Sequence, residues 1–130
     1  MTDVIAAVLA AQLRGVVRLE IGHVLNRVSV RAALGPHDVD ALAMQIVETR
    51  DPRSVSAIVT AIDRTQAHAA SGARADLRYA IRAFDARGRI VGRVYLDAFG
   101  RRGLIDGSPV TFESDAIKRA LVAAAPSLAR

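Results

Sequence analysis

The sequence predicts an α+β domain in which an antiparallel β-sheet is covered on one face by helices. Residues 76–112 alternate apolar with polar side chains between turn residues, which is typical of a strand meander. Residues 38–68 carry apolar side chains at helical spacing in two stretches with a very short joint, which is typical of an αα-hairpin. A terminal helix follows at about 114–125, so strands and helices are segregated along the chain.

The first 34 residues contain one helix and one ambiguous stretch. Thr2 and Asp3 supply an N-cap and a first-turn acid ahead of apolar residues at 4, 5, 8, 9 and 13, which predicts a first helix. Apolar residues at 17, 19 and 21 then alternate with charged ones, which predicts a β-hairpin over 16–34 with Gly22-His23 as its two-residue loop. The same residues also fit a helical period, so a continued helix is the alternative.

The αα-hairpin is predicted from two N-terminal signals and two apolar stripes. Asp38 precedes apolar positions 39, 42, 43, 46 and 47, and Asp51-Pro52 restarts the pattern at 55, 58, 59 and 62. Ser114 and Asp115 start the terminal helix, which Pro126 ends. With 130 residues the chain supports one ordinary core, so we expect a single compact domain over 1–130.

Burial fixes the register of the predicted hairpin over 78–99. Pairing 84 with 91, 82 with 93, 80 with 95 and 78 with 97 gives an inner face without charge. The neighbouring register would place Arg93 and Asp97 in the core, at a cost of several kcal/mol for each unpaired buried charge. The favoured register also makes Arg78 and Asp97 cross-strand neighbours, for which we expect an ion pair.

The outer face of this hairpin is the predicted partner-binding site, because it mixes arginines with aromatic and apolar residues. Its members, with the loop that follows, are Arg78, Arg82, Phe84, Val91, Arg93, Tyr95, Phe99, Arg101 and Arg102. Aromatic residues and arginine are typical of interface centres. Three hypotheses account for the rings: cover by the chain's own N-terminal hairpin or terminal helix, a protein partner or homodimer, and nucleic acid stacked on Tyr95 or Phe99.

The formal charge of +5 is concentrated in residues 74–102, where eight arginines face three aspartates. Nucleic acid or an acidic protein is therefore a candidate partner for this segment.

The absence of cysteine excludes disulfides and thiolate metal sites, and the three histidines are far apart in sequence. No nucleotide-binding or hydrolase motif is present, so we expect no enzyme activity, no cofactor and no metal. The N-terminal residues lack a secretion pattern and no stretch suits a membrane span, which predicts a cytoplasmic protein.

A small α+β domain with a strand meander and no catalytic motif is similar in architecture to bacterial inhibitor and immunity proteins. The resemblance implies a non-catalytic protein-binding module, with self-association as one form of that activity. Inhibitors of basic nuclease toxins are expected to be acidic, whereas this chain is basic, so we expect an acidic or neutral partner. The alternative is a nucleic-acid-binding protein that uses the arginine-rich segment 74–102.

Overall fold

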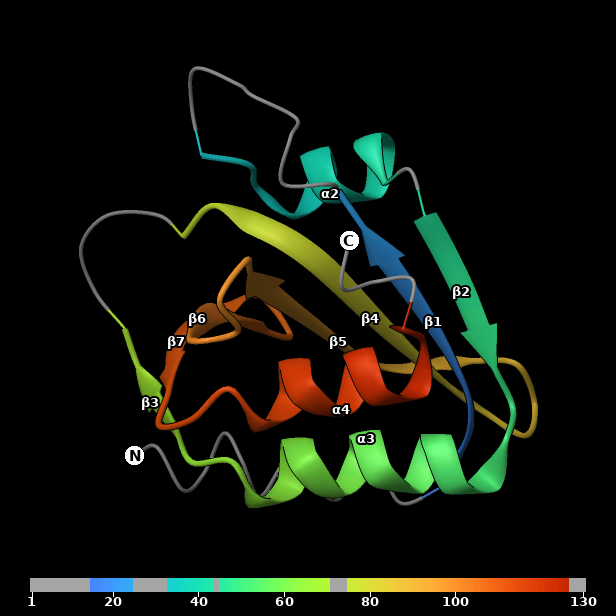
Figure 1. The fold of residues 1–130 in the computed structure, drawn as a ribbon. Coiled ribbons are helices and arrows are strands. Elements are labelled where there is room, and N and C mark those ends of the chain that lie inside the picture. The colour runs from blue at the N-terminus through green and yellow to red at the C-terminus, as the bar shows by residue number, and fades with distance from the viewer. Residues whose placement is uncertain (1–14, 25–32, 44, 71–74, 127–130) are drawn as a thin grey trace.

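The computed structural model describes residues 15–24, 33–43, 45–70 and 75–126. The described strands form one seven-stranded antiparallel sheet in the order β2-β1-β4-β5-β6-β7-β3, which confirms the α+β class. In chain order the elements are β1 (Val16–His23), α2 (Pro36–Leu42), β2 (Gln45–Thr49), α3 (Pro52–Arg64), β3 (Ala67–Ala69), β4 (Leu77–Asp85), β5 (Ile90–Asp97), β6 (Arg102–Ile105), β7 (Ser108–Phe112) and α4 (Ala116–Ala124). Figure 1 shows α3 and α4 side by side across the sheet, whereas α2 lies apart from them.

The main core lies between one face of the sheet and the helices α3 and α4. Asp51 caps α3 by accepting the Ser54 N–H at 3.2 Å, and Pro52 begins the helix. The apolar stripe of α3 is buried at Val55, Ile58 and Ile62. From the sheet and from α4 the largest fully buried apolar side chains are Leu19, Ile21, Tyr79, Leu96, Ile117 and Leu121. The predictions of α3 and of a terminal helix are thus confirmed.

The β4–β5 hairpin has the predicted register in its middle and departs from it at both ends. The partners Arg82 with Arg93 and Ala80 with Tyr95 are as expected. A shift between Ala83 and Phe84 pairs Phe84 with Ile90 in place of Val91. Val91 is consequently turned toward the main core, against which it packs, so its placement on the outer face was wrong.

The second register shift, between Leu77 and Tyr79, removes the predicted ion pair of Arg78 with Asp97. Asp97 is opposite Leu77 instead. Arg78 is buried and its guanidinium contacts the Asp76 carboxylate at 2.9 Å. Leu77, which the predicted register places on the inner face, packs instead in an apolar cluster on the outer face. A bulge therefore exchanged the faces of residues at this end of the hairpin.

The predicted αα-hairpin is wrong, because a strand separates its two helices. Helix α2 begins at Pro36 and ends at Leu42, and the residues that continued its stripe form β2, which pairs with β1. In a strand successive side chains point to opposite faces, so Val47 packs against the main core while Ile46 is 69% exposed. The end of the predicted hairpin also differs, since residues 67–69 form β3 against β7.

Residues 16–23 form a strand, but the hairpin turn predicted there is wrong. Gly22 and His23 lie inside β1, where Gly22 is opposite Ile46 on one side and Ala80 on the other. His23 is fully buried and stacks on Tyr79 with 4.3 Å between ring centroids. Strand β1 thus obtains both neighbours from distant parts of the chain. The predicted first helix, and the second strand of the predicted hairpin over 25–32, lie outside the described residues.

In the described part of the chain no helix is long and apolar enough to cross a bilayer, and the longest, α3, has 13 residues.

A close backbone approach of β5 and β6 provides a test of this fold. A Cβ atom at Gly103 would overlap the carbonyl oxygen of Tyr95, and a backbone atom cannot yield as a flexible side chain does. We expect Gly103→Ala to lower the free energy of unfolding by about 2 kcal/mol or more, measured by urea denaturation. Gly15→Ala is the control, since a Cβ there meets no described atom, and its effect is expected to stay within about 0.5 kcal/mol. Equal stability of the two variants would contradict the β5–β6 pairing.

Candidate functional site: a groove on the outer face of the sheet

Helix α2 covers part of the outer face of the sheet, the face that carries the predicted binding residues. A second apolar cluster, here called the outer cluster, is buried between them and consists of Val24, Leu34, Val39, Leu77, Ala80 and Tyr95. The hypothesis that the chain covers its own outer face is therefore confirmed in part. The covering element is α2, whereas the prediction named the N-terminal hairpin or the terminal helix.

A single carboxylate connects α2 to the sheet. Asp40 accepts a hydrogen bond from the Tyr95 hydroxyl at 3.1 Å and forms an ion pair with Arg82 at 2.8 Å. Arg82 also lies 3.9 Å from Glu20, which in turn pairs with Arg18 at 3.3 Å. These ion pairs link α2, β4 and β1, so most of the charge that the outer face presents here is neutralised within the chain.

The aromatic residues of the predicted site are buried. Tyr95 is 6% exposed and belongs to the outer cluster. Phe84 is 7% exposed and lies beneath the guanidinium of Arg18, whose Cζ atom is 3.8 Å from the ring centroid. With Arg78 buried and Arg82 in ion pairs, four of the predicted residues are engaged within the chain.

The remaining predicted residues do not form one surface. Phe99, which is 74% exposed, and Arg101 lie in the loop between β5 and β6, and Arg102 is the first residue of β6. The Asp97 carboxylate holds this loop by accepting the backbone N–H groups of Arg101 at 3.0 Å and Arg102 at 3.4 Å. Arg93 alone lies at the middle of β5, exposed on the outer face.

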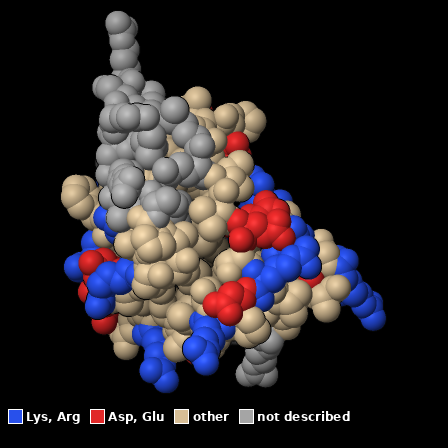
Figure 2. Space-filling model, turned by 45° about the vertical axis from the view of Figure 1, so that its right-hand side comes forward, with Lys and Arg blue, Asp and Glu red and all other residues tan. Residues whose placement is uncertain are grey.

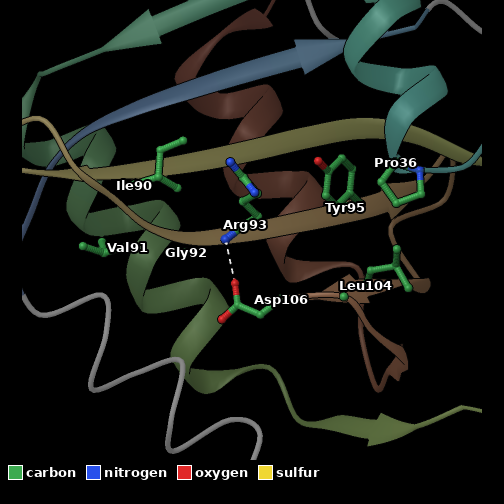
Figure 3. Close-up of a pocket in the computed structure, with 9 residues that line it drawn as sticks. Pro36, Ile90, Val91, Gly92, Arg93, Tyr95, Leu104 and Asp106 are labelled. Atoms are coloured by element: carbon green, nitrogen blue, oxygen red, sulfur yellow. Dashed lines mark hydrogen bonds between the residues drawn. The ribbon is translucent and has the colours of Figure 1, made fainter.

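A groove of about 640 Å³ surrounds Arg93 and is here called the Arg93 groove. It lies between the start of α2 and the turn that joins β6 to β7 (Figure 3). Its lining residues are Pro36, Ile90, Val91, Gly92, Arg93, Tyr95, Leu104, Asp106 and Gly107. Figure 3 shows Ile90, Arg93 and Tyr95 projecting toward the same side of β5. The groove therefore combines several apolar side chains with the Arg93 guanidinium and the Asp106 carboxylate.

The backbone of Arg93 is fixed by the turn at Asp106-Gly107. The Asp106 carboxylate accepts the Arg93 N–H at 3.0 Å, and the Asp106 N–H donates to the Arg93 carbonyl, also at 3.0 Å. Both turn residues have positive φ, 46° at Asp106 and 86° at Gly107, which Asp and Gly tolerate better than most residues. The contact of this turn with β5 was not predicted from the sequence.

The side chain of Arg93 lacks the partners that other arginines of the face have. The residue directly opposite Arg93 on β4 is Arg82, and two like charges in opposite positions of paired strands repel each other. Arg82 is compensated by Asp40 and Glu20, whereas Arg93 forms no ion pair with any residue in the described ranges. An anion at Arg93 would relieve this repulsion, so the groove is suited to a ligand that carries a carboxylate or phosphate.

Of the residues that line the groove, sequence reasoning named Val91, Arg93 and Tyr95 as binding residues and missed the others. Pro36, Ile90 and Leu104 were not among the predicted binding residues. The signal available was the Asp106-Gly107 turn, which follows β6 and must bring the β6–β7 connection close to the middle of β5.

The groove offers binding groups but no constellation for metal or nucleophilic chemistry. Among the residues that the structure describes, no group of three His, Cys, Asp or Glu side chains is placed to hold a metal ion. The lining of the groove contains no serine, threonine, cysteine or histidine. Comparison with protein-family models, with curated proteins and with solved structures finds no match for the chain.

The anchoring of α2 makes a prediction about tyrosine ionisation. Burial raises the pKa of the Tyr95 hydroxyl above its ordinary value, and the adjacent Asp40 carboxylate raises this pKa further. Burial also raises the pKa of Tyr79, the second of the two tyrosines. In a Tyr79→Phe background, an absorbance titration is expected to place the Tyr95 pKa above the ordinary value of about 10. Adding Asp40→Asn is expected to lower the pKa of Tyr95.

The raised pKa of Tyr95 also determines how the stability of the fold changes with pH. Because the folded-state pKa of Tyr95 is raised, its contribution to stability is present below pH about 10 and is lost as the pH rises through the folded-state value. Asp38→Asn is the control for the titration, since Asp38 lies in the first turn of α2 and accepts the Gly35 N–H. If Asp38→Asn and Asp40→Asn change the tyrosine titration equally, the contact of Asp40 with Tyr95 is wrong.

Proposed function

We propose that the protein is a non-catalytic protein-binding module that recognises an acidic or neutral partner through the Arg93 groove. The observation that carries the proposal is the guanidinium of Arg93, which forms no ion pair with the described residues, lies opposite Arg82 and lines a groove with apolar residues. This combination of arginine, aromatic edge and apolar contact is typical of residues that dominate binding energy at interfaces. The proposal keeps the outer face of the 78–99 hairpin as the binding surface, reduced to the part that α2 leaves open.

The groove supports binding better than catalysis for a chemical reason. The titratable groups that line it are Arg93, Tyr95 and Asp106. Tyr95 donates its proton to Asp40 in a hydrogen bond, and Asp106 accepts a backbone N–H. A nucleophile with an adjacent base is thus not provided by these three side chains.

The distribution of charge weighs against nucleic acid as the partner. Of the arginines in segment 74–102, Arg78, Arg82 and Arg89 form ion pairs with acidic residues. Arg87 and Arg101 lie beyond opposite ends of β5, which is 8 residues or about 25 Å long. The face shown in Figure 2 carries both acidic and basic side chains, several of them next to one another. A continuous track for phosphates would require neighbouring cations without such partners.

Affinity capture with a matched pair of charge reversals tests the proposed surface. Arg93→Glu replaces the cation in the groove, and we expect it to abolish capture of the partner from a lysate of the source cells. Arg53→Glu is the control, because Arg53 is exposed in the first turn of α3, where an acidic residue is favourable. A protein retained by the wild type and by Arg53→Glu, but not by Arg93→Glu, supports the proposal. Retention that is insensitive to Arg93, or retention of nucleic acid only, contradicts it.

Self-association is the second form of the proposal, and Phe99 is the residue best placed for it. The Phe99 loop is held by Asp97 and by the Lys118 ammonium, which donates to the Ala98 carbonyl at 2.5 Å, yet Phe99 is 74% exposed. A rigid loop that presents an aromatic side chain loses little entropy on binding. We expect sedimentation to give a mass that rises with concentration for the wild type and not for Phe99→Ser. Ile46→Ser, at a second exposed apolar position, is the control; a wild-type mass that stays monomeric at both concentrations excludes this form.

A further inference from the structure

We infer that the ligand of the Arg93 groove is an extended segment of a partner protein with an acidic residue between two apolar residues, each two positions away. The acidic side chain contacts Arg93, and the apolar side chains contact Ile90 at one end and Tyr95 with Leu104 at the other. This inference rests on the proposed function and specifies the chemistry of the partner at the same site.

The spacing of the groove residues matches that of an extended chain. Arg93 and Tyr95 are two residues apart on one face of β5, and their side chains are therefore about 7 Å apart. Side chains i and i+2 of an extended peptide have the same separation. Ile90 lies on the same side because of the register shift at Phe84, and it is 41% exposed. The three contacts thus follow one line along β5 (Figure 3).

The charge and the length of the groove favour a peptide segment over a small anion. Arg93 has no ion-pair partner in the part of the chain that the structure describes and lies opposite Arg82, so a ligand carboxylate gains a charge-assisted hydrogen bond and relieves repulsion. The apolar contacts at Ile90 and Tyr95 lie opposite Phe84 and Ala80, which are four residues or about 13 Å apart on β4, and this span exceeds the reach of an isolated carboxylate. A single anion would leave these apolar contacts unused.

The segment is expected to lie over the sheet and not to extend it. Residues 94–96 of β5 are paired on both sides, with β4 and with β6, and the Arg93 N–H and carbonyl bond to Asp106, so the backbone groups of residues 93–96 are engaged within the chain. Recognition therefore depends on side chains, unlike the addition of a strand at a sheet edge, where backbone hydrogen bonds supply affinity. The dependence on Arg93 is accordingly expected to be large.

Short peptides of defined sequence test the inference directly. The probes are acetylated, amidated pentapeptides with leucine at both ends, glutamate, glutamine or lysine in the centre, and serine between. Binding is measured by NMR chemical-shift titration of the full chain. We expect the glutamate peptide to bind about tenfold more tightly than the glutamine peptide, and the lysine peptide to bind most weakly. Arg93→Gln is expected to remove the preference for glutamate, and Arg53→Gln to preserve it, with the amide spectrum of each variant confirming its fold.

Three results would overturn the inference: equal binding of the glutamate and glutamine peptides, a preference that survives Arg93→Gln, or binding of acetate or inorganic phosphate as tight as that of the glutamate peptide. The capture experiment separates this failure from failure of the proposed function. Arg93-dependent capture without a glutamate preference refutes the extended acidic segment and leaves the protein-binding function standing. A glutamate preference without any captured protein supports the inference and removes support from the proposed function.

Discussion

The contact of Asp40 with Arg82 and Tyr95 determines what the outer face of the sheet can do. Helix α2 has only seven residues and one buried side chain, Val39, so its intrinsic stability is small and its position depends on contacts with the sheet. The Asp40 carboxylate supplies two of these contacts from one side chain. Because α2 covers this part of the sheet, the Tyr95 side chain is buried in the outer cluster and is not exposed to solvent. The Arg93 groove remains open beyond one edge of α2.

Charge compensation on this face explains why Arg93 differs from its neighbours. Ion pairs among Arg18, Glu20, Arg82 and Asp40 connect β1, β4 and α2, and each member lies within 4 Å of an opposite charge. Because these partners are partly exposed to water, the value of the network lies more in fixing geometry than in the free energy of folding. Arg93 stands next to this network without joining it. A cation that forms no ion pair with any described residue therefore lines the Arg93 groove.

The sequence allowed the strand meander, α3, α4 and the central register of the hairpin to be predicted, because each depends on a local signal. Asp51-Pro52 starts a helix through its own hydrogen bond, and one register of 79–83 with 92–96 buries no charge. The errors arose where neighbouring strands decide the outcome. Residues 45–49 form so short a stretch that their apolar pattern fits both the helical period and the alternation of a strand. Pairing with β1 selects the strand. The bulges that turned Val91 inward and displaced Arg78 likewise depend on packing across several strands.

The groove and the outer cluster share Tyr95, and this links recognition to the fold. The ring is buried with Val39 and Leu77 beneath α2, while its edge forms part of the groove. A ligand that contacts this edge favours the conformation in which α2 is docked, and by thermodynamic linkage the docking of α2 favours the ligand to the same extent. Asp40 is thus a positioning residue for a groove that it does not line. The Asp40 carboxylate then contributes both to the position of a short helix and, on the proposed function, to the affinity of the nearby groove.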